Sequence, residues 1–242
     1  MKVVTVVPTY NEASNLPGLL QALLAQPIPG LHVLVVDDES PDGTGRLAEE
    51  LALRSPGRID VMHRQGVRGL GRAYVDGFQW ALGQGADVVV QMDADLSHSP
   101  ADVPRLLAGL DGADLVIGSR YVPGGSVDEH WGFGRNFLSR SANALSRSLL
   151  GLATHDATSG FRGWTRRALE SVDPGRMVSN GYLLQVEMVY LSEKLGLRIA
   201  EIPIYFADRK IGLSKMSLRV KIEAALGLLR VWRTHHKVHR LG

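Results

Sequence analysis

The chain has 242 residues, of which 45% are hydrophobic and 21% charged, proportions typical of one large globular domain. It has no cysteine, which excludes a disulfide framework and thiolate metal sites. No apolar run approaches the ~20 residues that cross a bilayer, and the short apolar run in MKVVTVVPTYNE is not a secretion signal. We therefore expect a cytoplasmic protein without a transmembrane segment.

The formal net charge of +2 is distributed unevenly along the chain. Residues 209–242 contain nine Lys or Arg and one acid, whereas the rest contains 18 Lys or Arg and 24 acids. A basic segment after a mildly acidic body indicates an anionic partner, which is a phosphate, a membrane surface or nucleic acid. The segment has one tryptophan and no aromatic ladder, so we expect no nucleic acid partner.

The first half of the chain alternates between apolar runs and amphipathic segments. The continuous apolar runs predict buried strands at residues 2–8, 32–38, 58–63, 86–92 and 113–119. The segments between them predict helices, the first of them capped by Asn11 and others following Asp42 and spanning about 71–84 and 101–109. This alternation predicts an α/β fold with right-handed crossovers and a mostly parallel sheet flanked by helices.

The second half reads differently. A Gly-rich loop at residues 121–134 precedes further elements, with helices predicted at 135–151, 182–195 and 216–234 and a strand at 197–206. The last helix has apolar residues at spacings of three and four, with its cations largely off that stripe, so it is amphipathic and basic. Two interpretations stay open: the helix lies on a membrane surface, or its apolar stripe packs on the domain.

Polar clusters follow four of the predicted strands, at PTYNE (8–12), DDESPDGT (37–44), DADLSH (93–98) and GSRY (118–121). Ligands of open α/β sheets bind outside the carboxyl ends of the strands. The sequence therefore predicts that these four clusters converge on one crevice.

The cluster after the fourth strand contains two carboxylates one residue apart, Asp93 and Asp95. Two close carboxylates repel each other, and each is costly to bury alone. A divalent cation removes both penalties, and Mg²⁺ or Mn²⁺ is typically held by one or two carboxylates together with substrate phosphates. We therefore expect a cation at this strand end.

The clusters after the first two strands fit a nucleotide. Asp37 and Asp38 end a parallel strand, where a carboxylate can accept hydrogen bonds from a ribose or a base. Tyr10 offers a ring for stacking. Glu12 either contacts a ligand or complements a helix dipole, and Asp42 either contacts a ligand or caps the next helix.

Several cations in the second half indicate a second anion. Arginine binds phosphate in a bidentate manner. The candidates follow the Gly-rich loop or the last strand, and they are Arg120, Arg135, Arg140, Arg209 and Lys215.

Together these motifs resemble the family 2 glycosyltransferases of GT-A fold, and more narrowly the dolichol- or polyprenol-phosphate mannose synthases. The residues that carry the resemblance are VPTYNE (7–12), VVDDESPDGT (35–44), MDADLSHSP (92–100), GSRY (118–121), GRNFLSRSAN (134–143), DATSGFR (156–162) and FADRKIGLSK (206–215). The resemblance covers residues 3 to about 216 and implies a GT-A (Rossmann-like) catalytic domain at 1–215, with a C-terminal amphipathic helix and tail at 216–242.

The resemblance also implies an activity, which is inverting transfer of mannose from GDP-mannose to a polyprenyl (dolichyl) monophosphate on the cytoplasmic face of a membrane. By the family pattern, the donor would be bound by Pro8, Tyr10, Glu12, Asp37, Asp38, Asp93, Ala94 and Asp95. Asp95, with Asp93, would hold Mg²⁺ or Mn²⁺ against the diphosphate. Ser97 stays open as a further metal ligand, because some members have Gln there. The two phosphates would be bound by Arg120, Arg135 and Arg209 together with Lys215.

Other functions remain as alternatives. The donor could be UDP-glucose or another nucleotide sugar, because loop geometry reads the base and the sugar. A sugar nucleotidyltransferase uses similar strand ends, but it would need a Gly-rich basic loop where this chain has PTYNE. A binding module would use the basic tail without any catalysis.

Overall fold

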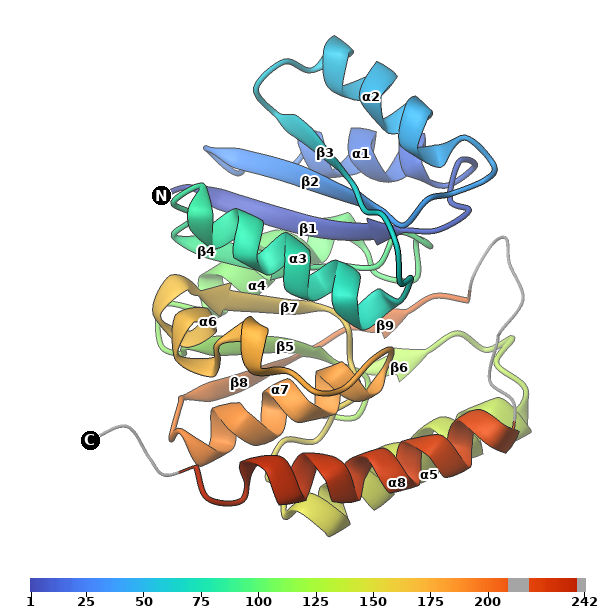
Figure 1. The fold of residues 1–242 in the computed structure, drawn as a ribbon, viewed down its shortest axis with the longest axis vertical. Helices are drawn as coiled ribbons and strands as arrows, with labels where there is room; N and C mark the ends of the chain where they lie inside the picture. The colour runs from blue at the N-terminus through green and yellow to red at the C-terminus, as the bar shows by residue number, and fades with distance from the viewer. Residues whose placement is uncertain (209–217, 239–242) are drawn as a thin grey trace.

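The computed structural model describes residues 1–208 and 218–238. A seven-stranded sheet forms the centre of the molecule, with strand order β3-β2-β1-β4-β7-β5-β8 (Figure 1). Its strands are β1 (Val3–Thr9), β2 (Leu31–Asp37), β3 (Ile59–His63), β4 (Val88–Gln91), β5 (Leu115–Ser119), β7 (Arg162–Thr165) and β8 (Ile199–Pro203). β7 is antiparallel to β4 and β5, and the other pairs are parallel. The predicted α/β fold with a mostly parallel sheet is confirmed.

Helices cover both faces of the sheet (Figure 1). One face packs against α1 (Leu16–Leu24), α2 (Thr44–Arg54) and α4 (Val103–Gly109). The other face packs against α3 (Leu70–Gly83), α6 (Arg166–Val172) and α7 (Leu183–Lys194). β1 supplies Val3 and Val7 to the first core and Val4 and Val6 to the second, as expected for a strand buried on both sides.

Two long helices, α5 (Phe133–Leu150) and α8 (Leu218–His235), lie side by side along one end of the molecule (Figure 1). α8 inserts Leu228 and Val231 into the core that includes α7. Its last residue, His235, contacts the buried Glu187 carboxylate through Nε2 at 2.6 Å. One side of α8 therefore packs on the domain. The predicted boundary at residue 215 lies outside the described residues.

Three details differ from the sequence-based expectation. Asn11 does not cap a helix: its φ is +61°, and α1 begins at Leu16. The single strand predicted at 197–206 is two strands, β8 and β9 (Tyr205–Phe206), and β9 pairs with β6 (Ser126–Val127) in a separate small sheet. β7 and α6 were not predicted, because the run RGWT carries no strand signal of its own.

Candidate active site

A cleft of about 190 Å³ lies at the carboxyl ends of β1, β2 and β4. These three strands are parallel and adjacent, so their final residues and the loops that follow meet at one edge. The cleft is lined by Pro8, Thr9, Tyr10, Glu12, Asp38, Leu70, Ala73, Asp93, Ala94, Asp95 and Tyr182. Seven predicted donor-site residues are thus brought together, namely Pro8, Tyr10, Glu12, Asp38, Asp93, Ala94 and Asp95; their roles stay a prediction.

The fourth predicted cluster, GSRY at 118–121, does not line this cleft in the described part of the chain. The reason is topological: β7 lies between β4 and β5 and separates their ends by one strand. The expected single crevice is therefore two neighbouring regions. We name them after the roles predicted from the sequence: the donor side lies after β1, β2 and β4, and the acceptor side lies after β5 and around α5 and β9.

The two carboxylates of the donor side sit in a tight turn in which Leu96 has a φ of +61°. Asp93 accepts a hydrogen bond through Oδ1 from the Tyr74 hydroxyl at 2.7 Å. Asp95 is buried, and its Oδ1 accepts hydrogen bonds from the backbone N–H and the hydroxyl of Ser97. Ser97 thus holds one carboxylate in place, and its role as a metal ligand stays a prediction.

Tyr74 is a contributor that the sequence did not reveal. It lies on α3, is fully buried, and stacks on Phe78 with ring centroids 5.6 Å apart. Burial, with the nearby Asp93 carboxylate, raises the pKa of Tyr74 well above its usual value. The phenol therefore keeps its proton at neutral pH and acts as the donor to Asp93.

The donor set fits a hard divalent cation that is completed by a substrate. Asp93 and Asp95 supply carboxylate oxygens on one wall of the cleft. Within residues 1–208 and 218–238, no group of three or more His, Cys, Asp or Glu could hold a metal by itself. Mg²⁺ and Mn²⁺ tolerate such a set because substrate phosphates and water provide the remaining ligands.

Asp37 and Asp38 hold the loops that shape the donor side. Asp37 accepts hydrogen bonds from the hydroxyls of Thr9 and Ser40, and so joins the ends of β1 and β2. Asp38 forms a buried ion pair with Arg64 and accepts from the N–H of Gly69 at 2.6 Å. Both carboxylates are engaged in this way, and their predicted contact with the nucleotide stays a prediction.

Asp42 precedes Gly43, the N-cap residue of α2, so Asp42 is not the N-cap itself but bonds to the first turn of this helix. Its carboxylate accepts from the N–H and hydroxyl of Thr44, at the first turn of α2, and from the N–H of Ala13. Nearby, the Arg68 guanidinium lies over the Tyr10 ring, 5.1 Å from its centroid, and donates to the Tyr10 hydroxyl. The aromatic residue expected to stack on a base is therefore covered by a cation at the cleft.

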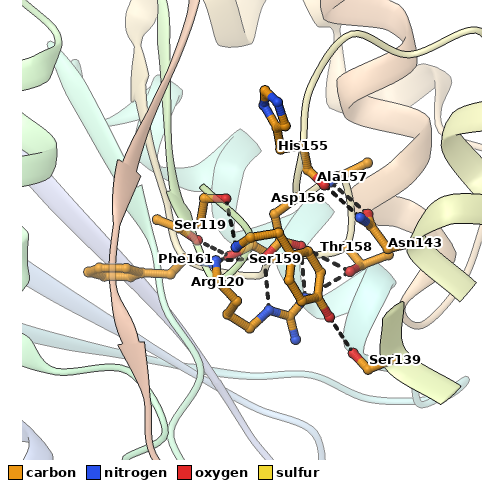
Figure 2. Close-up of polar contacts among 12 residues, drawn as sticks. Ser119, Arg120, Ser139, Asn143, His155, Asp156, Ala157, Thr158, Ser159 and Phe161 are labelled. Atoms are coloured by element: carbon orange, nitrogen blue, oxygen red, sulfur yellow. Dashed lines mark hydrogen bonds and ion pairs between the residues drawn. The ribbon is translucent and has the colours of Figure 1, made fainter. Parts of the chain in front are cut away.

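The acceptor side is organised by a buried ion pair between Arg120 and Asp156 (Figure 2). Nε and Nη2 of Arg120 donate to the two carboxylate oxygens at 2.8 Å, and its backbone N–H donates to the same carboxylate. Burial would raise the pKa of Asp156, but Arg120 outweighs it and lowers that pKa. Arg120 is thus held by Asp156 of the DATSGFR motif; its role in phosphate binding stays a prediction.

The same motif is joined to α5. Asn143 donates to the carbonyl of His155 and accepts from the N–H of Ala157, as the dashed lines in Figure 2 show. Ser139, one turn earlier on α5, shares a hydrogen bond with the Tyr121 hydroxyl at 2.8 Å. α5 is therefore fixed relative to Arg120 at two positions.

The other predicted cations of the acceptor side lie near the start of α5. Arg135 lies over the Trp131 ring at 4.1 Å and forms an ion pair with Asp208 at 2.5 Å, in which both side chains are 34% exposed. Arg140 lies over the Tyr121 ring at 5.1 Å and donates to Asn136. Arg209 and Lys215 lie outside the described residues.

His98 lies between the two sides and was not singled out from the sequence. It is buried, stacks on Phe161 at 5.1 Å, and meets the Phe206 ring edge-on at 5.2 Å. Burial lowers its pKa, so the imidazole is neutral at neutral pH. The backbone carbonyl of Ser97 also accepts a hydrogen bond from Ala207, so the carboxylate turn and the end of β9 are directly joined.

Paired carboxylates at the carboxyl edge of the sheet, with a neighbouring arginine cluster, form an arrangement suited to phosphorylated ligands in α/β enzymes. Residues 4–173 match the family "Glycosyl transferase family 2". The chain belongs to this family, and the resemblance inferred from the motifs is confirmed.

Two curated relatives are similar over most of their length. One, from Mycolicibacterium smegmatis, is a "Polyprenol monophosphomannose synthase", 49% identical over 217 residues that cover 89% of this chain and 81% of the relative. The other, from Micrococcus luteus, is an "Undecaprenyl-phosphate mannosyltransferase", 45% identical over 95% of this chain and 93% of the relative.

Solved structures extend the comparison to the fold. Glucosyl-3-phosphoglycerate synthase from Mycobacterium tuberculosis, solved with Mn²⁺, UDP and its product, matches with a TM-score of 0.64 and 21% identity. The match covers 96% of this chain and 79% of that one. At this identity the likeness concerns the fold, which is that of the GT-A glycosyltransferases.

Proposed function

We propose that this enzyme transfers mannose from GDP-mannose to a polyprenyl monophosphate and inverts the anomeric centre. The observation that carries the proposal is the direct junction between the carboxylate turn of the donor side and the arginine-rich acceptor side, through Ser97 and Ala207. The names of the two relatives, both mannose-transferring enzymes that act on polyprenyl phosphates, support the same substrates.

The proposed chemistry needs no general base. A phosphomonoester has a second pKa of about 6, so the acceptor phosphate is largely dianionic at pH 7. One of its oxygens forms a bond to C1 of mannose while the bond from C1 to the diphosphate oxygen breaks, and the electron pair leaves with GDP. Arg135 and the paired Arg120 offset the charge of the meeting phosphates.

Asp93 and Asp95 would hold Mg²⁺ or Mn²⁺ beside the donor diphosphate. When bound there, such a cation supplies electrostatic stabilisation of the negative charge on the leaving group. Tyr10, Glu12 and the loops held by Asp37 and Asp38 would orient the nucleotide. Metal dependence and GDP-mannose as the donor are both parts of this proposal.

The proposal includes peripheral attachment to a membrane. Among the described helices, none is long and apolar enough to cross a bilayer. The paired helices α5 and α8 instead expose large apolar side chains, and a groove of about 250 Å³ lies between them. The exposed apolar side chains are Phe137, Leu145, Leu149, Leu229 and Trp232. The exposed cations Arg140, Arg230 and Arg233 on the same helices suit anionic lipid head groups.

Transfer of labelled mannose from GDP-mannose to polyprenyl phosphate tests the reaction, with Mn²⁺ present and with EDTA in excess. We expect product only with the metal, and none from UDP-glucose. Transfer from UDP-glucose at an equal or higher rate would show that GDP-mannose is not the preferred donor. Full activity in EDTA would show that the reaction needs no divalent cation.

Sedimentation with vesicles that contain anionic lipid tests the attachment. We expect Leu229→Glu and Trp232→Glu together to reduce binding, because both side chains are nearly half exposed on α8. Leu53→Glu is the matched control, because Leu53 is 83% exposed on α2. Equal sedimentation of both variants would contradict the proposed membrane face.

A further inference from the structure

The carboxylate of Asp93 has a buried partner, Tyr74, that lies outside the motifs quoted for the resemblance. The Tyr74 hydroxyl donates to Asp93 Oδ1 at 2.7 Å, and Tyr74 is fully buried on α3. We propose that Tyr74 is a positioning residue that fixes the Asp93 carboxylate for divalent cation binding. This inference rests on the proposed function, because it takes Asp93 as a cation ligand.

Tyr74 can hold a fixed position because α3 lies unusually close to the sheet. A Cβ atom at Gly77 would lie 2.4 Å from Val6 Cγ1, so the helix approaches β1 at a distance that only glycine allows. The Tyr74 ring stacks on Phe78 with an interplanar angle of 24°, and both rings are fully buried. The hydroxyl therefore reaches the carboxylate from a rigid helix rather than from a loop.

The opposite side of Asp93 is confined by Gly160. A Cβ atom at this glycine would lie 3.2 Å from Asp93 Oδ2, closer than most side-chain contacts. The backbone N–H of Asp93 points to His98 Nδ1 at 3.4 Å. The Tyr74 hydroxyl contacts one oxygen of Asp93, and Gly160 lies next to the other. The orientation of the carboxylate is therefore fixed without a bound cation.

Such partners influence cation affinity although they never touch the cation. A hydrogen bond to a ligating carboxylate fixes its orientation, and loss of the bond typically weakens metal binding by about 10–100-fold. In Tyr74→Phe the ring and its packing stay, and only the donor to Asp93 is lost. We therefore expect a weaker cation site in an otherwise intact fold.

The experiment measures Mn²⁺ binding by titration calorimetry on the full chain in the presence of GDP. For Tyr74→Phe we expect the Kd for Mn²⁺ to rise about 10–100-fold. In the transfer assay the Mn²⁺ concentration for half-maximal rate should rise equally, while kcat at saturating Mn²⁺ should return close to the wild-type value. Tyr190→Phe is the matched control, because it removes the hydroxyl of a buried tyrosine on α7, away from Asp93.

Asp93→Asn distinguishes failure of the proposed cation site from failure of the proposed role of Tyr74. If this variant binds Mn²⁺ as the wild type does, the proposed cation site is wrong. If it loses Mn²⁺ binding while Tyr74→Phe keeps the wild-type Kd, only the role of Tyr74 is overturned. An equal loss of kcat at all Mn²⁺ concentrations would also overturn it, because that pattern indicates a structural defect.

A second variant covers the case in which Tyr74→Phe fails to fold, which circular dichroism would show. Gly160→Ala adds a methyl group 3.2 Å from Asp93 Oδ2 and disturbs the same carboxylate from the other side. We expect it to weaken Mn²⁺ binding. If Gly160→Ala folds and its Kd for Mn²⁺ is unchanged, the orientation of the Asp93 carboxylate does not control cation binding, and the proposal is wrong.

Discussion

The donor and acceptor sides meet at the same edge of the sheet but are built in opposite ways. On the donor side the cleft is lined by carboxylates, and neutral hydroxyls and N–H groups hold most of them, as for Asp37, Asp93 and Asp95. Asp38 is the exception, because it is paired with Arg64. On the acceptor side the charged groups are arginines, which are paired with carboxylates and stacked on rings, as for Arg120 and Arg135.

This difference matters for what each side can bind. Neutral donors place no positive charge beside these carboxylates, which suits the binding of a cation and its diphosphate. Paired arginines have their charge partly offset, so an incoming phosphate must add to or replace the existing partner. The buried partner of Arg120 is hard to replace, whereas Asp208, the partner of Arg135, is 34% exposed and easier to replace.

The largest expected effect comes from removing charge on the donor side. Asp95→Asn keeps the size of the side chain and an acceptor for Ser97, but it removes a proposed cation ligand. We expect a loss of about 4 kcal/mol of transition-state stabilisation, about a thousand-fold in rate. The rate of transfer is measured at saturating substrates. Asp87→Asn is the control, because Asp87 lies at the opposite end of β4, and we expect it to keep the wild-type rate. Normal turnover of Asp95→Asn would end the assignment of the donor side.

Next in size is the removal of an acceptor-side cation. Arg135→Met keeps much of the contact with Trp131 but cannot bind phosphate. A charged hydrogen bond contributes about 1.5–3 kcal/mol, so KM for polyprenyl phosphate should rise about 10–100-fold with little change for GDP-mannose. Arg147→Met, near the far end of α5, should leave both KM values unchanged. A rise in KM for GDP-mannose alone would show that Arg135 binds the donor and not the acceptor.

A smaller effect concerns stability at the opposite edge of the sheet, where β5 and β8 begin. Burial would raise the pKa of Asp114, before β5, but hydrogen bonds from Arg167 and Arg198 outweigh it and lower that pKa to about 2. A depressed pKa means that this stabilisation is complete above the ordinary value of 3.8 and is lost as pH falls towards 2.

Asp114→Asn should therefore cost about 1–2 kcal/mol at pH 7, a value reduced because both arginines are largely exposed. Urea denaturation at pH 7 and at about pH 2.5 should show this difference shrinking in acid. Asp102→Asn, which removes the pair of a more exposed carboxylate with Arg105, is the control. A difference that does not depend on pH would show that the charge of Asp114 is not the cause.

The smallest expected effect tests whether the pair of Arg135 competes with phosphate. Asp208→Asn removes the charge that faces Arg135. Exposed pairs contribute about 0.2–1 kcal/mol, so KM for the acceptor should fall by up to about five-fold. An increase in KM, measured in the same transfer assay, would mean that Asp208 orients Arg135 rather than competing with its ligand.

The sequence predicted the parts of the fold that local patterns encode. The buried strands of the first half carry continuous β-branched runs, and the helices carry regular apolar spacing, so both were found close to their observed bounds. β7 was missed because its four residues begin with a buried arginine, Arg162, whose guanidinium donates to three backbone carbonyls. No local pattern reveals that a charged residue will be satisfied in this way.

The candidate site was predictable to a similar degree. Strand ends in one parallel sheet must share an edge, so Tyr10, Asp38 and Asp93 could be grouped in advance. The partners could not, because Tyr74 and Asp156 lie far along the chain from the residues they hold. His98 could not be singled out either, because its aromatic neighbours Phe161 and Phe206 lie far along the chain.

The order of the strands also has a consequence for synthesis on the ribosome. The donor side uses β1 to β4, which are complete once residue 91 has emerged. β5 is made soon after, but its partners among the described strands are β7 and β8, so its place in the sheet depends on residues 162–203. β4 likewise pairs with β7, and Tyr182 lines the cleft, so both the sheet and the cleft wait for the second half of the chain. Because a domain folds as a unit, we expect the fold to be completed only after most of the chain has emerged.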